Sequence, residues 1–302
     1  MTWVFLALLT HLFWGLTNIG EKYLVDKEFK NPFVYVFLGF VAGLVGLLIV
    51  PFVDFFIPSI HILFWIFIAS VGFCSGVLFY IKAVQIEEIS RINMLWSFLP
   101  LFTLLGSHLF IDERLSVIEF SAFTFLVLGG FVASLHAKSG KFKLSLAFLY
   151  MLVACVFFAA YDIVLRYITD GLGTSFEIVF IFSTIFFVLI GLLFFISNQF
   201  RTDFFEEKKN FFTWKVIGII LVINILSKIG LLFNMWSISL APVSLVNAME
   251  GTQAIFVFLI TIFLTLSFPH IIKEEIDRRN IFLKVVAICF VVVGLVILGF
   301  AG

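Results

Sequence analysis

The sequence is poor in charged residues and in cysteine. Asp, Glu, Lys and Arg make up 13% of the 302 residues, whereas a soluble globular protein carries about 25%. The 19 basic and 19 acidic residues cancel, which gives no electrostatic reason to expect nucleic acid or an acidic partner. The three cysteines, Cys74, Cys155 and Cys289, each lie inside an apolar run. This placement argues against a disulfide framework and against a cysteine-ligated metal.

Apolar residues, in contrast, are abundant. They make up 63% of the chain, and the mean hydropathy is +1.20, so the composition suits a lipid bilayer. No run alternates apolar and polar residues, which excludes a transmembrane barrel and predicts an all-α membrane protein. Divided at charges, prolines and polar clusters, the runs predict ten transmembrane helices, at residues 2–25, 33–57, 60–83, 91–111, 115–135, 144–168, 175–198, 214–239, 244–268 and 281–300.

The connections between these runs are short. The first run lacks a basic start and a cleavage site, so we expect it to be retained as a transmembrane helix. The longest hydrophilic segments, near residues 136–143, 201–210 and 273–280, are too short to fold as separate domains. Function is therefore expected to lie within the helix bundle.

The chain contains an internal repeat. At an offset of 144, residues 13–23 align with residues 157–167, and Lys22-Tyr23 meets Arg166-Tyr167. At an offset of 154, four further identities appear: Gly76 with Gly230, Phe79 with Phe233, Ser90 with Ser244 and Asn93 with Asn247. Each half holds five predicted helices, an odd number, so the second copy enters the membrane in the opposite sense. We therefore expect two inverted five-helix repeats, residues 1–137 and 138–302, which is an architecture of alternating-access transporters.

Several short motifs follow one another along the chain in a characteristic order and spacing. They are Phe13-Trp14-Gly15 with Lys22, Ala83, Pro100, Asp112-Glu113-Arg114-Leu115-Ser116, Leu128-Gly129-Gly130 and, in the second half, Ala241-Pro242-Val243-Ser244. In this respect the chain resembles, over nearly its whole length, the ten-helix EamA-type proteins of the drug/metabolite transporter superfamily. The second half departs from the pattern, with Glu274-Glu275-Ile276 after an insertion around residues 267–273. The resemblance implies export or exchange of small metabolites and does not identify the metabolite.

The distribution of basic residues and the resemblance disagree on orientation. Nearly all Lys and Arg residues flank the connections that follow the odd-numbered helices, and only Arg114 and Arg166 lie on the other side. By the positive-inside rule both termini are then outside the cell. The resemblance implies that both are inside. The two interpretations agree that the termini share one side of the membrane.

Polar side chains form a stripe on the first predicted helix. His11, Trp14, Asn18 and Lys22 follow the spacing i, i+3, i+7 and i+11 and so share one helix face. They could line a central cavity, because polar groups inside a membrane usually face a cavity or a partner. Alternatively, His11 and Asn18 make hydrogen bonds between helices while Lys22 extends to the membrane interface.

Two further helices carry ionisable groups. The sixth contains Tyr161, Asp162 and Arg166, and the last two could form an ion pair within the helix. The ninth begins with a polar patch of Asn247, Glu250 and Gln253. Glu250 is the best candidate for a carboxylate that exchanges a proton or recognises a cation. A plain polar contact of Glu250 with Asn247, or with Asn93 across the pseudo-twofold axis, is the alternative. Asn93 and Trp96, on the fourth helix, complete the candidate cavity lining on this side.

Lys228 lies near the middle of the eighth predicted helix, one turn after Asn224 on the same face. A lysine at the bilayer centre costs about 2.5–3.5 kcal/mol on insertion scales, and here it is too deep to reach the interface easily. We therefore predict that its ammonium faces the space between the repeats. The predicted partner is Glu250, with Asp162 or Glu21 as second choices.

Catalytic chemistry finds no support in the sequence. It contains no His-Glu-x-x-His helix, no Gly-x-Ser-x-Gly elbow and no phosphate-binding glycine loop. Its five histidines are scattered one to a segment, which does not suggest a zinc site. We expect a protein that is not an enzyme and has no cofactor and no metal.

The sequence therefore predicts a secondary transporter, an exporter or exchanger of small organic metabolites in the plasma membrane. Its expected partners are a small-molecule substrate and the lipid bilayer, without nucleic acid. A proton gradient is a candidate driving force, and both a monomer and a homodimer are open. A flippase for a lipid-linked amphiphile is the main alternative, and a membrane scaffold that transports nothing is a weaker one.

Overall fold

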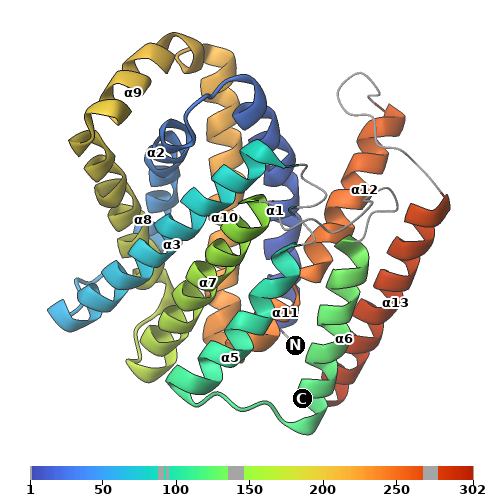
Figure 1. Ribbon diagram of the computed structural model, residues 1–302. Coiled ribbons are helices and arrows are strands. Elements are labelled where there is room, and N and C mark those ends of the chain that lie inside the picture. Colours follow the sequence, from blue (N-terminus) through green and yellow to red (C-terminus); the bar gives the residue numbers. More distant parts are fainter. Residues whose placement is uncertain (1, 88–91, 93–94, 135–145, 268–277, 302) are drawn as a thin grey trace.

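The described residues of the computed structural model are 2–87, 92, 95–134, 146–267 and 278–301, and every regular element among them is helical (Figure 1). This agrees with the predicted all-α class. In chain order the elements are α1 (Thr2–Lys27), α2 (Pro32–Ala42), η1 (Gly43–Phe52), α3 (Ile60–Ile86), η2 (Trp96–Phe98), α5 (Leu99–Ile111), α6 (Val117–Ser134), α7 (Leu146–Arg166), η3 (Tyr167–Gly171), α8 (Phe176–Leu192), η4 (Leu193–Ile196), α9 (Asn198–Phe211), α10 (Trp214–Leu240), α11 (Val243–Ala248), α12 (Gly251–Ser267) and α13 (Arg278–Ala301).

Many of these helices are long and apolar enough to cross a bilayer. Seven candidate spans lie in the described chain: Thr2–Val25, Pro32–Phe52, Ile60–Ile86, Leu146–Gly171, Phe176–Ile196, Trp214–Leu240 and Val243–Ile260. Three further apolar helices are shorter: Trp96–Ile111, Val117–Val132 and Val285–Gly299. Each of the ten apolar runs identified in the sequence thus contains helix, and seven of them meet the length of a full span.

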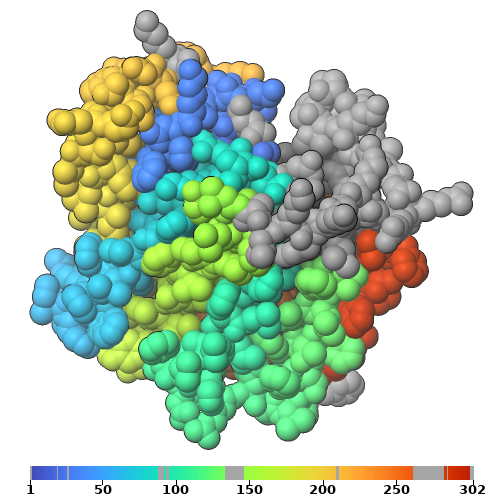
Figure 2. Space-filling model, in the orientation of Figure 1, coloured from blue at the N-terminus to red at the C-terminus, as the bar shows by residue number. Residues whose placement is uncertain are grey.

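The outer surface is as apolar as a lipid-facing surface needs to be. Phe52, Ile60 and Val117 are 82–84% exposed, which would be unfavourable in water. Figure 2 shows one face of the molecule, where α3, α5, α6 and α7 lie next to one another. These helices direct further large apolar side chains outward, among them Phe64 and Leu105.

The helices pack in pairs that are distant in sequence. The main contacts of α1 are with α10, those of α3 are with α7, and α6 packs along α13. Figure 1 shows both chain termini at the end of the bundle where α5 is connected to α6, with α9 at the opposite end. Helix α5 in turn contacts α7 and α11, which brings segments of the two halves of the chain together in the middle of the bundle.

Helix α9 lies where the sequence predicted only a hydrophilic connection, residues 201–210. Its Ser197 cap accepts a 3.4 Å hydrogen bond from the Phe200 amide. Phe200 and Phe204 both pack on Phe37 of α2, at ring-centroid distances of 6.0 and 5.9 Å. The helix is amphipathic, so its charges interrupted the apolar run although Phe200 and Phe211 are buried in the core. The other two hydrophilic segments lie wholly or largely outside the described residues.

Several of the apolar segments depart from a regular α-helix, three of them as follows. Segment Pro32–Phe52 changes from α2 to the 3-10 helix η1, which contains Pro51. Pro100 lies in the first turn of α5, directly after the short helix η2. A turn at Met249 and Glu250 separates α11 from α12. Backbone that leaves the regular helix at membrane depth is tolerated where it is buried in protein or lines a cavity, so these breaks indicate where a site can lie.

Candidate functional site

A cavity lies between the helices where the two halves of the chain meet. Its volume is about 160 Å³. Its wall is formed by α1, α2, α3, η2, α5, α7, α8, α10, α11 and α12, and by Glu250 from the turn before α12. The residues that line it are Trp14, Thr17, Asn18, Glu21, Tyr35, Val36, Gly39, Phe40, Phe73, Val77, Tyr80, Ile81, Trp96, Leu99, Phe158, Tyr161, Asp162, Phe187, Ile223, Asn224, Ser227, Lys228, Leu231, Asn234, Asn247, Glu250 and Gln253.

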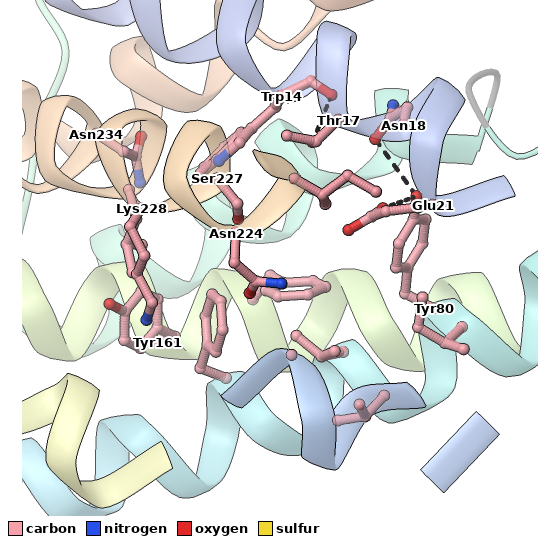
Figure 3. Close-up of a pocket in the computed structure, with 18 of the residues that line it drawn as sticks. Trp14, Thr17, Asn18, Glu21, Tyr80, Tyr161, Asn224, Ser227, Lys228 and Asn234 are labelled. Carbon is pink, nitrogen blue, oxygen red and sulfur yellow. Dashed lines mark hydrogen bonds between the residues drawn. The ribbon is translucent and has the colours of Figure 1, made fainter. Parts of the chain in front are cut away.

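The wall of the cavity is divided between polar and aromatic surfaces. The polar groups come mainly from α1, α10, α11 and the start of α12, and they include Asn224, Ser227 and Asn234 of α10 (Figure 3). The opposite wall is aromatic and comes from α3, η2, α7 and α8. There Trp96 lies between Tyr80 and Phe158, at ring-centroid distances of 5.3 and 5.4 Å. Such a cavity can hold a small molecule with a polar part and an apolar part.

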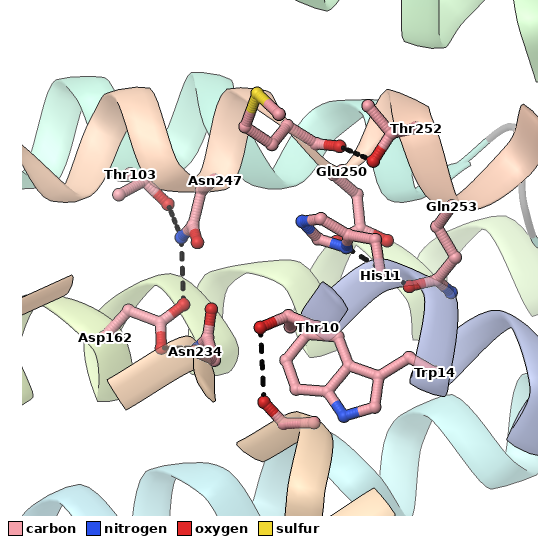
Figure 4. Close-up of polar contacts among 12 residues, drawn as sticks. Thr10, His11, Trp14, Thr103, Asp162, Asn234, Asn247, Glu250, Thr252 and Gln253 are labelled. Carbon is pink, nitrogen blue, oxygen red and sulfur yellow. Dashed lines mark hydrogen bonds and ion pairs between the residues drawn. The ribbon is translucent and has the colours of Figure 1, made fainter. Parts of the chain in front are cut away.

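Asp162 is the centre of a buried hydrogen-bond network (Figure 4). Its carboxylate accepts hydrogen bonds from the side-chain amides of Asn234, at 3.4 Å, and Asn247, at 2.9 Å. The Asn247 amide also donates to the hydroxyl of Thr103, at 2.9 Å. Three helices of the second half, α7, α10 and α11, are therefore tied together through one carboxylate, and α5 of the first half joins them through Thr103.

The suggested ion pair between Asp162 and Arg166 is wrong. Arg166 contacts Asp170 at 3.4 Å and donates to the backbone carbonyl of Ile238, at 2.8 Å. The guanidinium reaches the next turn of its own helix and the end of α10, while Asp162 faces the cavity. Arg166 does not line the cavity.

Glu21 forms a second polar group near the other end of the cavity (Figure 3). The Tyr80 hydroxyl donates to the Glu21 carboxylate, at 3.1 Å, and contacts the side-chain oxygen of Asn18, at 3.4 Å. Sequence reasoning placed Asn18 in the cavity lining but omitted Glu21. The signal was available, because Glu21 follows Asn18 by three residues and so lies on the same helix face. Tyr80 and Asn234 gave no comparable signal, since their role depends on how α3 and α10 pack.

Glu250 lies at the break between α11 and α12 and faces His11 of α1 (Figure 4). The Nδ1 atom of His11 lies 3.5 Å from the Glu250 carboxylate and 3.4 Å from the side-chain oxygen of Gln253. All three side chains are at most 6% exposed. His11 itself lies behind the cavity wall, while Glu250 and Gln253 line the cavity. Asn93, the suggested alternative contact of Glu250, lies outside the described residues.

Lys228 has a different environment from the one predicted. It is 9% exposed and its Nζ atom lies 4.6 Å from the centroid of the Phe187 ring and 6.0 Å from that of Phe180. Within the described chain no carboxylate lies within 4.0 Å of it, so the predicted ion pair with Glu250, Asp162 or Glu21 is wrong. The side chain extends from α10 toward α8 and η1, whereas Glu250 points toward α1.

Lys22 caps the end of a neighbouring helix. Its ammonium donates to the backbone carbonyls of Val84, at 2.9 Å, and Glu87, at 3.3 Å, at the C-terminus of α3. A cation is favourable there because the last carbonyls of a helix carry partial negative charge. Lys22 does not line the cavity. Of the residues that the sequence suggested, the cavity wall contains Trp14, Asn18, Trp96, Tyr161, Asp162, Asn224, Lys228, Asn247, Glu250 and Gln253.

The helices define a polytopic membrane protein with an internal cavity. Residues 1–135 match the model of the EamA-like transporter family, in agreement with the predicted resemblance over this part of the chain. The protein is an integral, multi-pass membrane protein. A solved crystal structure, titled only as that of a protein, has the same overall fold, with a TM-score of 0.64 and 15% sequence identity over 98% of this chain and 95% of the other. No curated protein matches the chain.

Proposed function

We propose that the protein is a secondary transporter, an exporter or exchanger of small organic metabolites, that works by alternating access between two inverted five-helix repeats, residues 1–137 and 138–302. The observation that carries the proposal is a set of duplicated contacts around the cavity. The equivalent residues of the two halves are separated by 144 or 154 positions, which are the two offsets of the internal repeat.

The first duplicated contact joins the first and third helices of each half. In the first half the Tyr80 hydroxyl of α3, which donates to Glu21, contacts the side-chain oxygen of Asn18 of α1 at 3.4 Å. In the second half Asn234 of α10 donates to Asp162 of α7, also at 3.4 Å. Asn18 and Asp162 differ by 144 positions, and Tyr80 and Asn234 differ by 154. The same pair of positions therefore makes the same kind of contact in both halves.

The second duplicated contact is a basic cap on the third helix. Lys22 donates to the Val84 carbonyl, at 2.9 Å, and Arg166 donates to the Ile238 carbonyl, at 2.8 Å. These pairs are again related by 144 and 154 positions. Each cation lies one turn after the polar residue of the first contact, so the two contacts form one repeated unit.

A third duplicated contact crosses between the halves. Trp14 of α1 packs on Gly230 of α10, and its equivalent Phe158 of α7 packs on Gly76 of α3. A Cβ atom added to Gly230 would lie 2.8 Å from the Trp14 ring, and one added to Gly76 would lie 3.1 Å from the Phe158 ring. The first helix of each half thus crosses the third helix of the other. A cavity at such a crossing can be exposed to either side by rocking one half against the other.

The test of this function is solute flux in reconstituted vesicles. Purified protein in liposomes is loaded with labelled amino acids, organic acids and nucleosides, and exchange against external solute is followed beside protein-free liposomes. The proposal expects protein-dependent, saturable flux of at least one solute. Movement of a lipid-linked sugar without any soluble solute would instead favour the flippase. If neither moved under any imposed gradient, transport would be excluded in favour of a scaffold.

Coupling to a proton gradient is proposed to use Glu250. His11 of α1 lies 3.5 Å from its carboxylate, and Asp162 and Cys155 of α7 and Tyr80 of α3 are near enough to interact with it electrostatically. Glu250 lies at the junction of two helix segments, where a change of charge can act on the packing of both. A buried carboxylate in such a place is a recurrent proton carrier in transporters.

Replacement of Glu250 with Gln is therefore expected to leave exchange of solute intact and to abolish accumulation driven by protons. One pH unit can support about tenfold accumulation when one proton moves with each solute. The measurement is solute accumulation in vesicles with and without a pH gradient. Glu21→Gln, in the same cavity, is the matched control and should keep the dependence on the gradient. Retention of gradient-driven accumulation in Glu250→Gln would contradict the assignment.

A further inference from the structure

The environment of Lys228 contains several polar groups that have no hydrogen-bond partner. The hydroxyls of Tyr161, Ser183 and Thr184 are buried and make no hydrogen bond. Among the described residues Lys228 makes no hydrogen bond or ion pair, and its Nζ atom lies over the rings of Phe180 and Phe187. An unpaired buried polar group costs free energy, so a group of them in one place calls for an explanation.

These groups converge on one side of the cavity. Phe180, Ser183, Thr184 and Phe187 of α8 follow the spacing i, i+3, i+4 and i+7 and so share one helix face. The Lys228 ammonium lies over both rings, which places it beside the turn that carries the two hydroxyls. The Tyr161 and Ser183 hydroxyls are neighbours that make no hydrogen bond. Tyr161 and Lys228 line the same end of the cavity (Figure 3).

The other fully buried hydroxyls of the described residues do make hydrogen bonds. Ser70 donates to the Ile66 carbonyl, at 2.7 Å, and Thr103 donates to the Leu99 carbonyl, at 2.9 Å, each one turn earlier in its helix. This local bond is the ordinary way for a buried Ser or Thr to be satisfied in a helix. Ser183 and Thr184 lack it. Their hydroxyl protons therefore remain available to a ligand.

The chemistry of the unpaired groups selects the ligand. The three cavity carboxylates, of Glu21, Asp162 and Glu250, already face Tyr80, two asparagines and His11. What remains near Lys228 is one cation and a set of hydroxyl donors. Donors around a cation in an apolar setting are complementary to an anion, since charge-assisted hydrogen bonds are the strongest that such groups make.

We propose that Lys228, Tyr161 and Ser183 form a binding site for a monovalent anion, which is either the carboxylate of the transported solute or a halide. The ammonium supplies the charge, the two hydroxyls supply directional donors, and Phe187 excludes water from one side. The role of this site in transport rests on the proposed function. Binding of the anion does not, and it can be measured on the purified protein without any flux.

The position of the ammonium depends on Gly43, at the start of η1. A Cβ atom at this position would lie 2.6 Å from Cε and 3.3 Å from Nζ of Lys228. Because the end of a lysine is flexible, Gly43→Ala should displace the ammonium without unfolding the protein and without altering any polar group. The variant therefore tests the placement of the charge separately from its presence.

The experiment measures thermal unfolding of the purified protein in detergent with sodium chloride or sodium benzoate, each titrated against sodium methanesulfonate at constant ionic strength. The proposal expects a rise in the unfolding midpoint with one or both anions. Lys228→Met should weaken the apparent affinity about ten- to hundredfold, the equivalent of one charge-assisted hydrogen bond. Ser183→Ala, Tyr161→Phe and Gly43→Ala should each weaken it about two- to tenfold.

Lys82→Met is the matched control. Lys82 also lies over aromatic rings, with its Nζ atom 5.0 Å from the centroid of Phe33, but it is outside the cavity. Its replacement should leave the response unchanged.

A response to benzoate alone assigns the site to a solute carboxylate, and a response to chloride assigns it to a halide. No response of the wild type, or a wild-type response in Lys228→Met, would overturn the proposal. If Lys228→Met does not fold, an unaltered response in both Ser183→Ala and Gly43→Ala would overturn it instead. Absence of flux with anion binding intact would count against the transport function and not against this site.

Discussion

Replacement of Gly251 with Ala is expected to destabilise the protein by about 3 kcal/mol or more, because overpacking against backbone cannot be relieved by a rotamer change. A Cβ atom on Gly251 would lie 2.4 Å from the Cα atom of Gly130 in α6 and 2.7 Å from its backbone nitrogen. The contact is reciprocal, since a Cβ atom on Gly130 would lie 2.7 Å from the Gly251 Cα atom. Small residues allow helices in membranes to approach in this way.

The measurement is the thermal unfolding midpoint in detergent, together with the yield of monodisperse protein. Gly218→Ala in α10 is the matched control, because nothing lies within 4 Å of the added atom. An Ala there should be neutral or stabilise the helix by up to about 1 kcal/mol. If Gly251→Ala unfolded at the wild-type temperature, α12 would not approach α6 as closely as described. The position of Glu250, which directly precedes Gly251, would then also be in doubt.

Replacement of Glu113 with Ala is expected to reduce flux about tenfold or more by releasing a contact between the halves. The Glu113 carboxylate accepts hydrogen bonds from the amides of Val243 and Ser244, at 2.8 and 3.1 Å, and from the Ser244 hydroxyl, at 2.5 Å. The hydroxyl of Ser107 donates to it as well, at 3.1 Å. Hydrogen bonds to a charged group contribute about 1.5–3 kcal/mol each, so their joint loss is enough for such a change in a conformational equilibrium.

The location of Glu113 gives this contact its expected role. It joins the connection between α5 and α6 to the start of α11, at the end of the bundle that holds both termini (Figure 1). The cavity extends the other way, toward Glu21 and Tyr80. In the proposed cycle the contact closes the cavity at the termini end and has to form and break in each turnover. Initial flux rates of Glu113→Ala, with Glu113→Gln as the variant that keeps an acceptor oxygen, test this role. Wild-type rates in both would show that the contact is structural only.

The helices could be predicted from sequence because lipid leaves the backbone little choice. A run of apolar residues at membrane depth has to satisfy its own hydrogen bonds, and it does so as a helix. Helix α9 was missed because its charged residues, such as Arg201 and Glu206, hid the phenylalanines that pack on α2. The turn at Met249 and Glu250 was also not predicted, since neither residue is a helix breaker, although Gly251, which packs against Gly130, follows them directly.

The sequence predicted many of the residues that line the cavity but not the groups that these residues contact. The periodicity of α1 placed Trp14 and Asn18 on one face, and both line the cavity. That periodicity gives the direction of a side chain relative to its own helix and not the identity of the helix opposite. For this reason Lys228 was predicted to pair with Glu250 although it reaches α8, and Arg166 was considered as a partner of Asp162 although it reaches the end of α10.

The central claim is that one cavity is open to the two sides of the membrane in turn. Labelling of a single cysteine at Ser227, which lines the cavity, tests it most directly. The protein for this test carries Ser227→Cys with Cys74, Cys155 and Cys289 replaced by Ser, and a membrane-impermeant maleimide is added to vesicles of each orientation. Alternating access predicts that the introduced cysteine is labelled from both sides, and that a transported solute or a pH gradient shifts the ratio of the two labelling rates. Labelling from one side only, under every gradient and solute, would contradict it.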